Sequence, residues 1–499
     1  MSSKASAQSK SLAQGTLFDF DKPLRDSVSW FEEMLSSLGL KEEPAWPDRF
    51  GKAIRQWVSE HKACPIRTLS LFSGGGGLDI AFHDAGFDIV QMVEVEPKYV
   101  ETLRINSQRG RLIEGAKVLC IDIRDYEPDA GLSIDFIIGG PPCQTFSAAG
   151  RRASGVSGTS DPRGTLFSEY ARILKRLQPA GFLFENVYGI TGAQDGLAWK
   201  EIQEAFKSVG YSIHSRVLDA ADYGVPQHRE RLFIVGIREG EYLFPCPTHG
   251  PDSPGEHPFY NAGRAVLNTD PSLVQQGLGG RFGHLLEDIP PGLNYSFYTK
   301  EMGHPAPVFS WRSKFSDFLY KADPDRPVRT IKAQGGQYTG PFSWENRPFT
   351  IAELKRLQTI PDDYEILGGR QAVIEQIGNS VPPQIGRMLA LSLLDQVMKI
   401  KLPFPIRYMP EERKLGFRQR KRSLTEIYSD KAREAIERLY GSGNLTRSPK
   451  ITDGVNDATR FLSRDFSWDE NQKPGSVAIR LLYEFADNGW TICGGLFQK

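Results

Sequence analysis

The sequence predicts an α/β fold with a doubly wound, mostly parallel sheet and a smaller domain inserted into it. From residue 66 onward, short apolar runs typical of buried strands alternate with amphipathic helical patterns, as they do in parallel sheets covered by helices. The alternation stops at residue 241, where proline, glycine, histidine and aromatic residues accumulate, and it resumes at residue 326. This interruption indicates that residues 241–325 form a separate, irregular module.

Composition indicates a globular protein rather than a secreted or membrane protein. The 499 residues are 39% hydrophobic, and 61 basic residues balance 61 acidic ones, so a nucleic-acid partner must be recognised through local features. The five cysteines include no CxxC pair, which argues against a disulfide framework. Cys246 and His249 supply only half of a zinc site. We therefore expect no metal. No stretch approaches the roughly 18 apolar residues of a membrane helix, so we expect a cytoplasmic protein.

The N-terminal region, residues 1–65, begins with a polar tail. Apolar residues then recur at helical spacing, first around Phe31 and Leu35 and again around Ile54 and Val58. This pattern predicts two helices within residues 24–62. We expect them to pack against the following domain rather than to bind a partner.

A glycine-rich turn follows the first predicted strand. Residues 68–72 predict a buried strand, Gly74 to Gly77 a sharp turn and residues 78–85 a helix, so backbone amides can approach a ligand closely. No Lys-Ser/Thr pair follows the glycines, which excludes a Walker phosphate loop. The next strand ends at Glu94, twenty residues beyond Gly74, where nucleotide-binding folds place an acid on ribose hydroxyls. The spacing favours an adenosine-containing ligand. Asp122, at the end of a third strand, either accepts from the adenine amino group or lies in a solvated loop.

Cys143 follows a short strand that two glycines and two prolines terminate. Ile134 and residues 136–138 are apolar and predict a short buried strand, and residues 139–142 cannot continue a central strand. The cysteine is therefore expected at the carboxyl end of a sheet strand, where open α/β sheets bind their ligands. Taken alone, it is either a reactive thiol or a small buried hydrophobe.

Further ionisable residues are expected close to Cys143. The strand at 181–187 ends with Glu185, and Gln227, Arg229 and Arg231 lead into the strand at 232–237. A thiol and a carboxylate at two strand ends predict a site, whereas the arginines alone are equally consistent with a solvated basic turn. The polar loop at 150–164 is either an ordinary insertion or a segment that closes over a substrate.

The C-terminal part resumes the α/β alternation and then leaves it. We expect alternation from RPVRTIKAQGG at 326–336, a turn at 378–383 and a helix at 384–397. The basic run at 413–422 is either a solvated linker or a contact for phosphates. An amphipathic helix is predicted at 424–440.

Seven motifs in order resemble those of the DNA cytosine-5 methyltransferases. They are FSGGGG (72–77), VEVE (93–96), GGPPCQTFS (139–147), FENV (184–187), QHRER (227–231), RPVRT (326–330) and IGNSVPP (377–383). The resemblance implies a Rossmann-like, S-adenosylmethionine-dependent catalytic domain at 66–240 and 326–400, with 241–325 as the target-recognition domain. Residues 1–65 and 401–499 lie outside it, and the role of the C-terminal extension is not implied.

The resemblance also implies roles for individual residues. Cys143 would attack carbon 6 of cytosine, framed by Pro142 and Gln144, while Glu185 would hold or protonate N3, and Arg231 would donate to O2. Arg229 would help to make the thiol site electropositive. Residues implied to bind S-adenosylmethionine are Phe72, Ser73, Gly74, Gly76, Gly77, Leu78, Glu94, Val95, Asp122, Ile123, Leu166, Asn379, Ser380 and Val381.

The activity implied by the resemblance is methylation of a flipped-out cytosine within a short sequence of duplex DNA. A bacterial, nucleoid-associated monomer is expected, acting as the protective methylase of a restriction-modification system without stable contact with an endonuclease. The alternatives are a tRNA cytosine-5 methyltransferase and a catalytically silent DNA-binding regulator. The four consecutive glycines, with Ser73 before them and Asp79 after them, depart from the commoner motif but remove no group that the chemistry needs.

Overall fold

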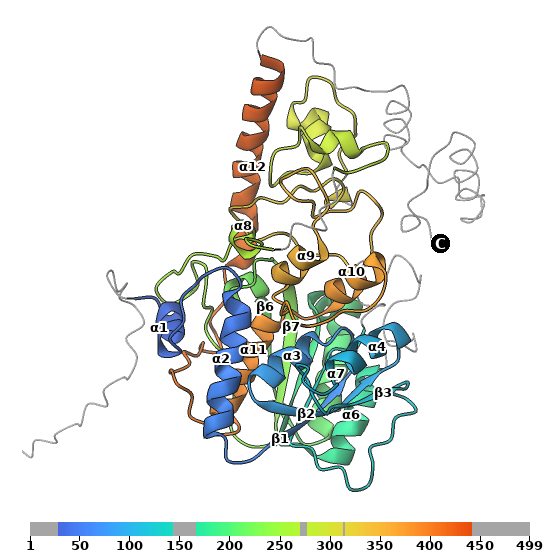
Figure 1. Cartoon of the computed structure of the whole chain (residues 1–499), viewed down its shortest axis with the longest axis vertical. Coiled ribbons are helices and arrows are strands. Elements are labelled where there is room, and N and C mark those ends of the chain that lie inside the picture. Colours follow the sequence, from blue (N-terminus) through green and yellow to red (C-terminus); the bar gives the residue numbers. More distant parts are fainter. Residues whose placement is uncertain (1–27, 143–165, 270–276, 313–314, 442–499) are drawn as a thin grey trace, which may run out of the picture.

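The computed structural model describes residues 28–142, 166–269, 277–312 and 315–441. Cys143, Gln144 and the loop at 150–164 therefore lie outside the described residues. A large lobe contains the sheet, a small lobe stands over one end of it, and a long helix runs beside the small lobe (Figure 1).

Seven strands form one sheet in the order β3-β2-β1-β4-β5-β7-β6. The strands are β1 (Ile66–Leu71), β2 (Phe87–Glu94), β3 (Lys117–Cys120), β4 (Phe136–Gly139), β5 (Gly181–Val187), β6 (Ser212–Asp219) and β7 (Glu230–Ile237). The first five strands in this order pair in parallel, and β7 pairs antiparallel with both β5 and β6. The predicted doubly wound, mostly parallel sheet is confirmed.

Alternate side chains of the central strands enter two apolar cores. On β4, Phe136 and Ile138 belong to one core, and Ile137 belongs to the other. On β5, Leu183 belongs to the first core, whereas Phe182 and Phe184 belong to the second. Each buried side chain of this size contributes about 1.5–3 kcal/mol. Because both faces are covered, these strands are apolar without alternation, which is why the sequence pattern identified them.

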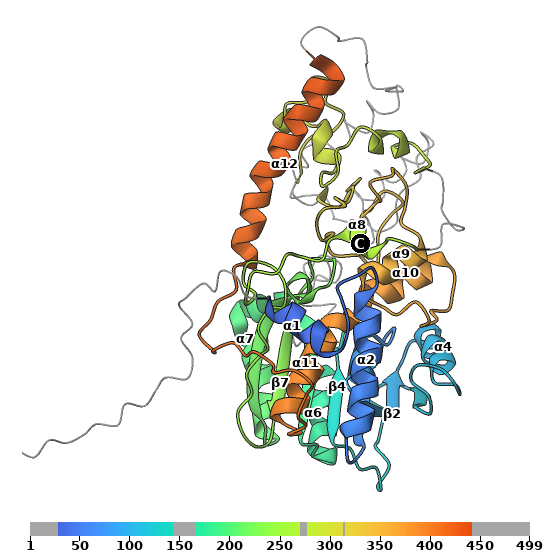
Figure 2. The same ribbon diagram turned by 60° about the vertical axis from the view of Figure 1, so that its left-hand side comes forward.

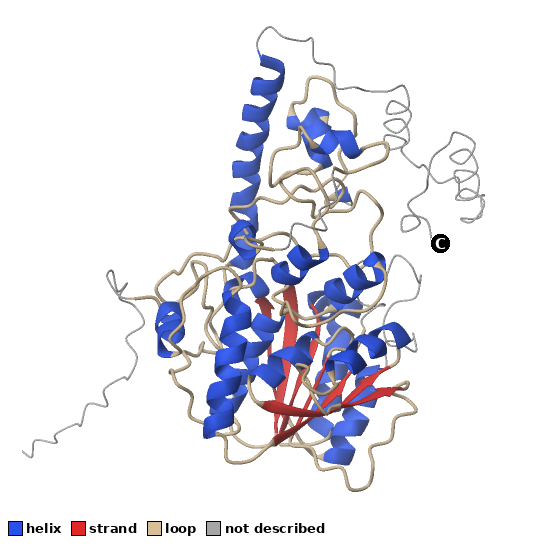
Figure 3. Ribbon diagram, viewed as in Figure 1, coloured by secondary structure: helices blue, strands red, loops and turns tan. Residues whose placement is uncertain are grey.

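Helices cover both faces of the sheet, as Figure 3 shows in blue around the red strands. The helices of the first face are α2 (Trp46–His61), α3 (Gly77–Asp84), α4 (Pro97–Asn106) and α11 (Pro383–Gln396), and those of the second are α6 (Leu166–Leu177) and α7 (Leu197–Ser208). The helices near the junction of the lobes are α8 (Ala262–Ala265), α9 (Ile351–Leu357) and α10 (Arg370–Asn379). The described part of the chain contains no helix long and apolar enough to cross a membrane.

The N-terminal helices pack against the large lobe, as predicted. Helix α1 (Trp30–Ser37) begins at a capping box, and α2 lies beside α11 (Figure 2). The buried carboxylate of Asp84 joins three helices, because it contacts Arg387 of α11 at 2.7 Å and Arg55 of α2 at 3.0 Å. A buried charge is tolerated when it is paired in this way.

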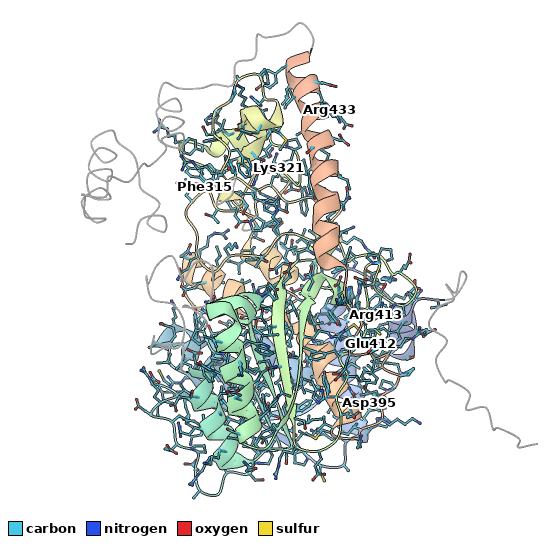
Figure 4. All side chains as sticks on the ribbon, turned by 180° about the vertical axis from the view of Figure 1, so that it is seen from behind. Phe315, Lys321, Asp395, Glu412, Arg413 and Arg433 are labelled. Carbon is cyan, nitrogen blue, oxygen red and sulfur yellow. The ribbon has the colours of Figure 1, made fainter. Side chains whose placement is uncertain are left out.

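The small lobe has its own apolar core, to which the C-terminal helix contributes. Aromatic and aliphatic residues between 282 and 338 pack with Ala432 and Ala435 of α12 (Phe417–Tyr440). Lys431 of the same helix contacts the buried Asp323 at 2.7 Å. Figure 4 shows Phe315 and Lys321 in this lobe beside α12, and Arg413 near the base of the helix. Helix α12 is thus part of the small lobe's packing, whereas Leu402, Phe404, Ile406 and Met409 before it belong to the first core of the large lobe.

Local predictions needed correction at four places. Residues 326–336 form no strand, because Val328 makes only an isolated bridge, with Gln227. Gly378 and Asn379 end α10 instead of opening a turn, and α11 begins at Pro383, directly after its N-cap residue Pro382. β3 ends at Cys120, two residues before Asp122. The basic run is partly helical, since α12 begins at 417.

β6 was not predicted. Only the last two of its side chains are buried, and its sequence mixes polar and apolar residues, so the strand depends on pairing with β7 rather than on its own pattern.

Candidate active site

The site lies at the carboxyl ends of the parallel strands, between the segments that follow β1 and β4. The strand order reverses at this point. From β1 the chain continues to β2 and β3 on one side of β1, and it then crosses over to form β4 on the other side of β1. A cavity of about 560 Å³ opens there. Predicted site residues that line it are Phe72, Ser73, Gly74, Gly77, Leu78, Glu94, Val95, Asp122, Ile123, Pro142, Leu166, Glu185, Arg229, Arg231, Asn379, Ser380 and Val381.

Close packing explains the glycines of the turn after β1. Gly76 has a left-handed φ of +84°, and a β carbon there would lie 2.2 Å from Tyr364 Oη. At Gly77 it would lie 2.2 Å from the carbonyl oxygen of Val381. Gly76 thus packs behind the turn and does not line the cavity, whereas Gly74 does, with no atom closer than 4.0 Å to its β-carbon position. The turn brings its backbone to the cavity, as an adenosine-containing ligand requires.

Glu94 joins the end of β2 to the glycine turn. Its Oε2 accepts from the N–H of Gly74 at 2.8 Å, and its Oε1 accepts from those of Val95 and Glu96 at 2.9 Å. Burial raises the pKa of this carboxyl, and the three backbone donors oppose that rise. Oε2 accepts only one of these bonds and keeps a lone pair for a ligand hydroxyl. The exposed side chain of Val95 adds an apolar surface beside it, so glycine turn, acid and apolar wall fit an adenosine moiety.

Asp122 lines the same end of the cavity but is already engaged. Its Oδ1 accepts from the backbone N–H and from Nε of Arg124, both at 2.9 Å. Hydrogen bonding from this guanidinium lowers the pKa of the Asp122 carboxyl. Ile123 is buried in the second core. An adenine amino group would therefore share Asp122 with Arg124.

Antiparallel pairing of β5 and β7 brings an acid and an arginine together. Val187 pairs with Arg231 in this register, so the end of β5 meets the start of β7, and Arg231 Nε lies 2.9 Å from Glu185 Oε1. Burial raises the pKa of Glu185, and the charges of Arg231 and Arg229 oppose the rise. Gly140 leaves room for the acid, because a β carbon there would lie 2.7 Å from its Oε2. The arrangement presents a carboxyl that can keep a proton beside a hydrogen-bond donor.

Arg229 is buried with most of its donors unused. Its Nε and Nη1 have no partner among the described residues, and Nη2 is 3.4 Å from the carbonyl oxygen of Asn379. Burial lowers the pKa of Arg229 well below its ordinary value, and the charge of Arg231 adds to this effect. Buried donors without acceptors are costly, so this guanidinium is available to donate hydrogen bonds to an acceptor that binds in the cavity.

Other cavity residues were not identified from the sequence. Tyr99 in α4 accepts from Asn379 Nδ2 and donates to Glu375 Oε1, both at 3.0 Å; no sequence signal marks it. Asp79 is fully buried, and burial raises the pKa of its carboxyl to about 7. The sequence does contain a clue to Asp79, because it is an acid within the otherwise apolar segment LDIAF at 78–82. The comparison of motifs identified it only as a departure from the commoner glycine-rich motif.

Comparison with known proteins agrees with this geometry. The family model described as C-5 cytosine-specific DNA methylase matches residues 66–395. Type II methyltransferase M.SacI of Streptomyces achromogenes is 34% identical over 373 residues, covering 66% of this chain and 93% of the relative. Type II methyltransferase M.FnuDI of Fusobacterium nucleatum is 43% identical over 358 residues, covering 65% and 93%.

A solved structure shows the same fold. It is a prophage-encoded protein of E. coli described as a DNA modification methyltransferase, with a TM-score of 0.50 and 21% identity over 67% of this chain and 99% of that one. The family match spans the sheet and every cavity-lining segment on both sides of the small lobe. The chain therefore belongs to the C-5 cytosine-specific DNA methylase family and is a DNA cytosine-5 methyltransferase.

Proposed function

We propose that the enzyme transfers a methyl group from S-adenosylmethionine to carbon 5 of a flipped-out cytosine in duplex DNA through a covalent adduct of Cys143. The observation that carries this proposal is the pairing of Glu185 with Arg231 in the cavity that the glycine turn and residues 139–142 also line. Cys143 follows this last segment directly in the sequence.

The proposed roles follow from the chemistry of cytosine. Carbon 5 is a poor nucleophile, and addition of the Cys143 thiolate to carbon 6 moves electron density to carbon 5. A proton from Glu185 to N3 neutralises the charge that develops on the ring, and the raised pKa of this carboxyl supports that role. Arg231 donates to O2, stabilising the same charge. Once carbon 5 carries the methyl group, a base such as water takes the C5 proton, the C5–C6 double bond re-forms, and the C6–S bond breaks to release the Cys143 thiolate.

Arg229 fits a second task at the same place. Its donors that have no partner among the described residues make the cavity electropositive, which favours a thiolate over a thiol with an ordinary pKa of about 8.5. Pro142 and Gln144 would present Cys143 from either side.

S-adenosylmethionine supplies the methyl group when bound. We propose that Glu94 accepts from its ribose hydroxyls, that Val95 and Ile123 contact the adenine, and that Asp122 accepts from the adenine amino group while still paired with Arg124. The turn at 72–78, together with Leu166 and residues 379–381, would complete the binding site.

Sequence recognition is proposed for the module at 241–325, with residues 66–240 and 326–400 as the catalytic domain. Carbon 6 is inaccessible in a stacked duplex, so the cytosine must leave the helix at a cost of about a few kcal/mol. The relatives' description as Type II methyltransferases supports the role of protective methylase in a bacterial restriction-modification system. We expect a cytoplasmic monomer that forms no stable complex with the endonuclease.

Bisulfite sequencing of DNA from cells that express the protein tests this function. We expect 5-methylcytosine at one short motif, its loss in Cys143→Ser, and no change in Cys64→Ser, which replaces an exposed cysteine. Duplex DNA carrying 5-fluorocytosine should trap the wild type covalently, since elimination is blocked. Methylation that survives Cys143→Ser, or methyl transfer to tRNA in place of DNA, would refute the proposal.

A further inference from the structure

Three metal-ligating side chains meet away from the catalytic cavity. Glu42 lies between α1 and α2, and His249 and His257 lie in the segment that follows β7. One donor atom from each side chain lies within 4.8 Å of the other two. None of the three lines the catalytic cavity. The cluster thus lies where the N-terminal helices meet the chain that leads toward the small lobe.

His249 has an unused nitrogen in the interior. The side chain is fully buried, its Nδ1 contacts Thr248 Oγ1 at 2.8 Å, and its Nε2 has no partner among the described residues. Leaving a buried polar atom unsatisfied costs about 1–3 kcal/mol. A proton on Nδ1 that is donated to Thr248 Oγ1 leaves the lone pair on Nε2, which is the form of imidazole that binds metals.

His257 is oriented in a way that suits a ligand. Its Nδ1 lies 3.1 Å from Ser29 Oγ, and its Nε2 lies 3.3 Å from Glu42 Oε2. A proton on Nδ1 that is donated to Ser29 leaves the lone pair on Nε2, which faces the carboxylate; such an outer hydrogen bond commonly fixes metal-binding histidines.

Aromatic packing holds both rings in place. The Phe31 ring lies 4.2 Å from that of His249 and 4.7 Å from that of His257, and Trp46 stacks on His249 at 5.8 Å. These contacts come from α1 and α2, so the N-terminal helices shape the cluster as well as supplying Glu42.

We propose that Glu42, His249 and His257 bind one divalent transition-metal ion of the zinc class. Two imidazoles and one carboxylate form a common zinc ligand set, with water as the fourth ligand. Ligand atoms about 2.1 Å from a tetrahedral zinc ion lie about 3.4 Å apart, which matches the 3.3 Å between His257 and Glu42. All three donor atoms lie within 4.8 Å of one another, so His249 has to approach the other two ligands by at most about 1.4 Å to reach the tetrahedral spacing.

Among the described residues, Arg264 is the one arginine or lysine in contact with the Glu42 carboxylate. Its Nη1 lies 3.3 Å from Glu42 Oε2, and its Nη2 donates to the Glu42 carbonyl oxygen at 2.8 Å. Its side chain is 44% exposed, so the guanidinium can turn toward solvent when the ion binds. The ion would fasten the N-terminal extension to the segment before the small lobe, a structural task separate from methyl transfer.

Zinc titration of the full-length protein, stripped with a chelator, tests this inference. We expect one zinc ion per chain by elemental analysis, no comparable binding of magnesium, and a visible absorption band when cobalt replaces zinc. Thermal unfolding should shift upward with zinc. His257→Ala and Glu42→Gln should each weaken zinc binding by at least about 10- to 100-fold. That is the loss typical when a residue that only hydrogen-bonds to a metal ligand is removed, and these variants remove a ligand itself.

His304→Ala is the matched control. His304 is also buried, and its Nε2 also has no partner among the described residues, but it lies outside the cluster. This variant should bind zinc as the wild type does. Substoichiometric binding by the wild type, or equal affinity in His257→Ala and His304→Ala, would overturn the inference. Because the readout is metal content, this result is independent of DNA methylation.

Discussion

Replacement of Glu185 by glutamine tests the catalytic arrangement most directly. A glutamine at this position would have nearly the same volume, and its carbonyl oxygen can still accept from Arg231 Nε, now 2.9 Å from the acid. The change therefore removes the transferable proton and little else. General acid–base catalysis contributes about 10²–10⁴-fold, which corresponds to about 2.7–5.4 kcal/mol at about 1.36 kcal/mol per tenfold change. We expect the rate at saturating DNA to fall by this factor.

The pH dependence gives the same test a second readout. Because burial raises the pKa of Glu185, the protonated form is present below that pKa and is lost as pH rises through it. The wild-type rate of tritiated methyl transfer should therefore decline on the alkaline side, and Glu185→Gln should lack this decline. Glu204→Gln, on the exposed face of α7, is the control. A Glu185→Gln enzyme with more than a tenth of wild-type activity, or with an unchanged alkaline decline, would refute the reasoning.

Three further predictions concern packing, the cofactor and DNA. Asp84→Ala leaves the buried Arg387 without its carboxylate and should lower the free energy of unfolding by about 3–5 kcal/mol in urea titrations, with part of the loss recovered when Arg387→Met is added; full additivity would contradict the pairing. Gly77→Ala places a β carbon 2.2 Å from a backbone oxygen and should cost about 1–3 kcal/mol; calorimetry should show weakened S-adenosylmethionine binding, and unchanged affinity would count against the proposed turn. Alanine at the four basic residues of 418–422 should reduce the slope of log K against log salt by about 0.9 for each phosphate that the variant no longer neutralises, whereas an unchanged slope would favour a solvated segment.

The alanine variant of the basic run leaves Arg413 unchanged, because this residue has a packing role. Its Nη2 donates to the carbonyl oxygen of Asp252 at 2.7 Å, so replacing it would disturb the approach to α12 as well as any phosphate contact. Keeping it unchanged separates the two effects.

Several features could be predicted because they are local in the chain. The strands that end at Leu71, Glu94, Gly139 and Val187 are short runs rich in apolar residues, and most of their side chains are buried. Burial on both faces of the sheet favours this pattern. Parallel strands expose their carboxyl ends at one edge, so the residues just beyond them were expected to meet. Glu94, Glu185 and the glycine turn do line one cavity.

Other features depend on contacts between distant segments. β6 forms by pairing with β7, and Val328 makes a single bridge where a strand was expected. Tyr99 reaches the site because α4 lies against α10 through Asn379 and Glu375. None of these contacts leaves a periodic pattern in the sequence.

The sequence by itself determined the fold class and the order of the chemical groups, since strand burial and motif spacing are properties of consecutive residues. Only the tertiary structure decided that Asp122 is already paired with Arg124, that Gly76 packs behind the turn, and that α12 completes the small lobe's core. It also brought Glu42 to two histidines more than 200 residues away. Burial and pairing of this kind depend on which surfaces meet in three dimensions, and sequence spacing carries no record of that.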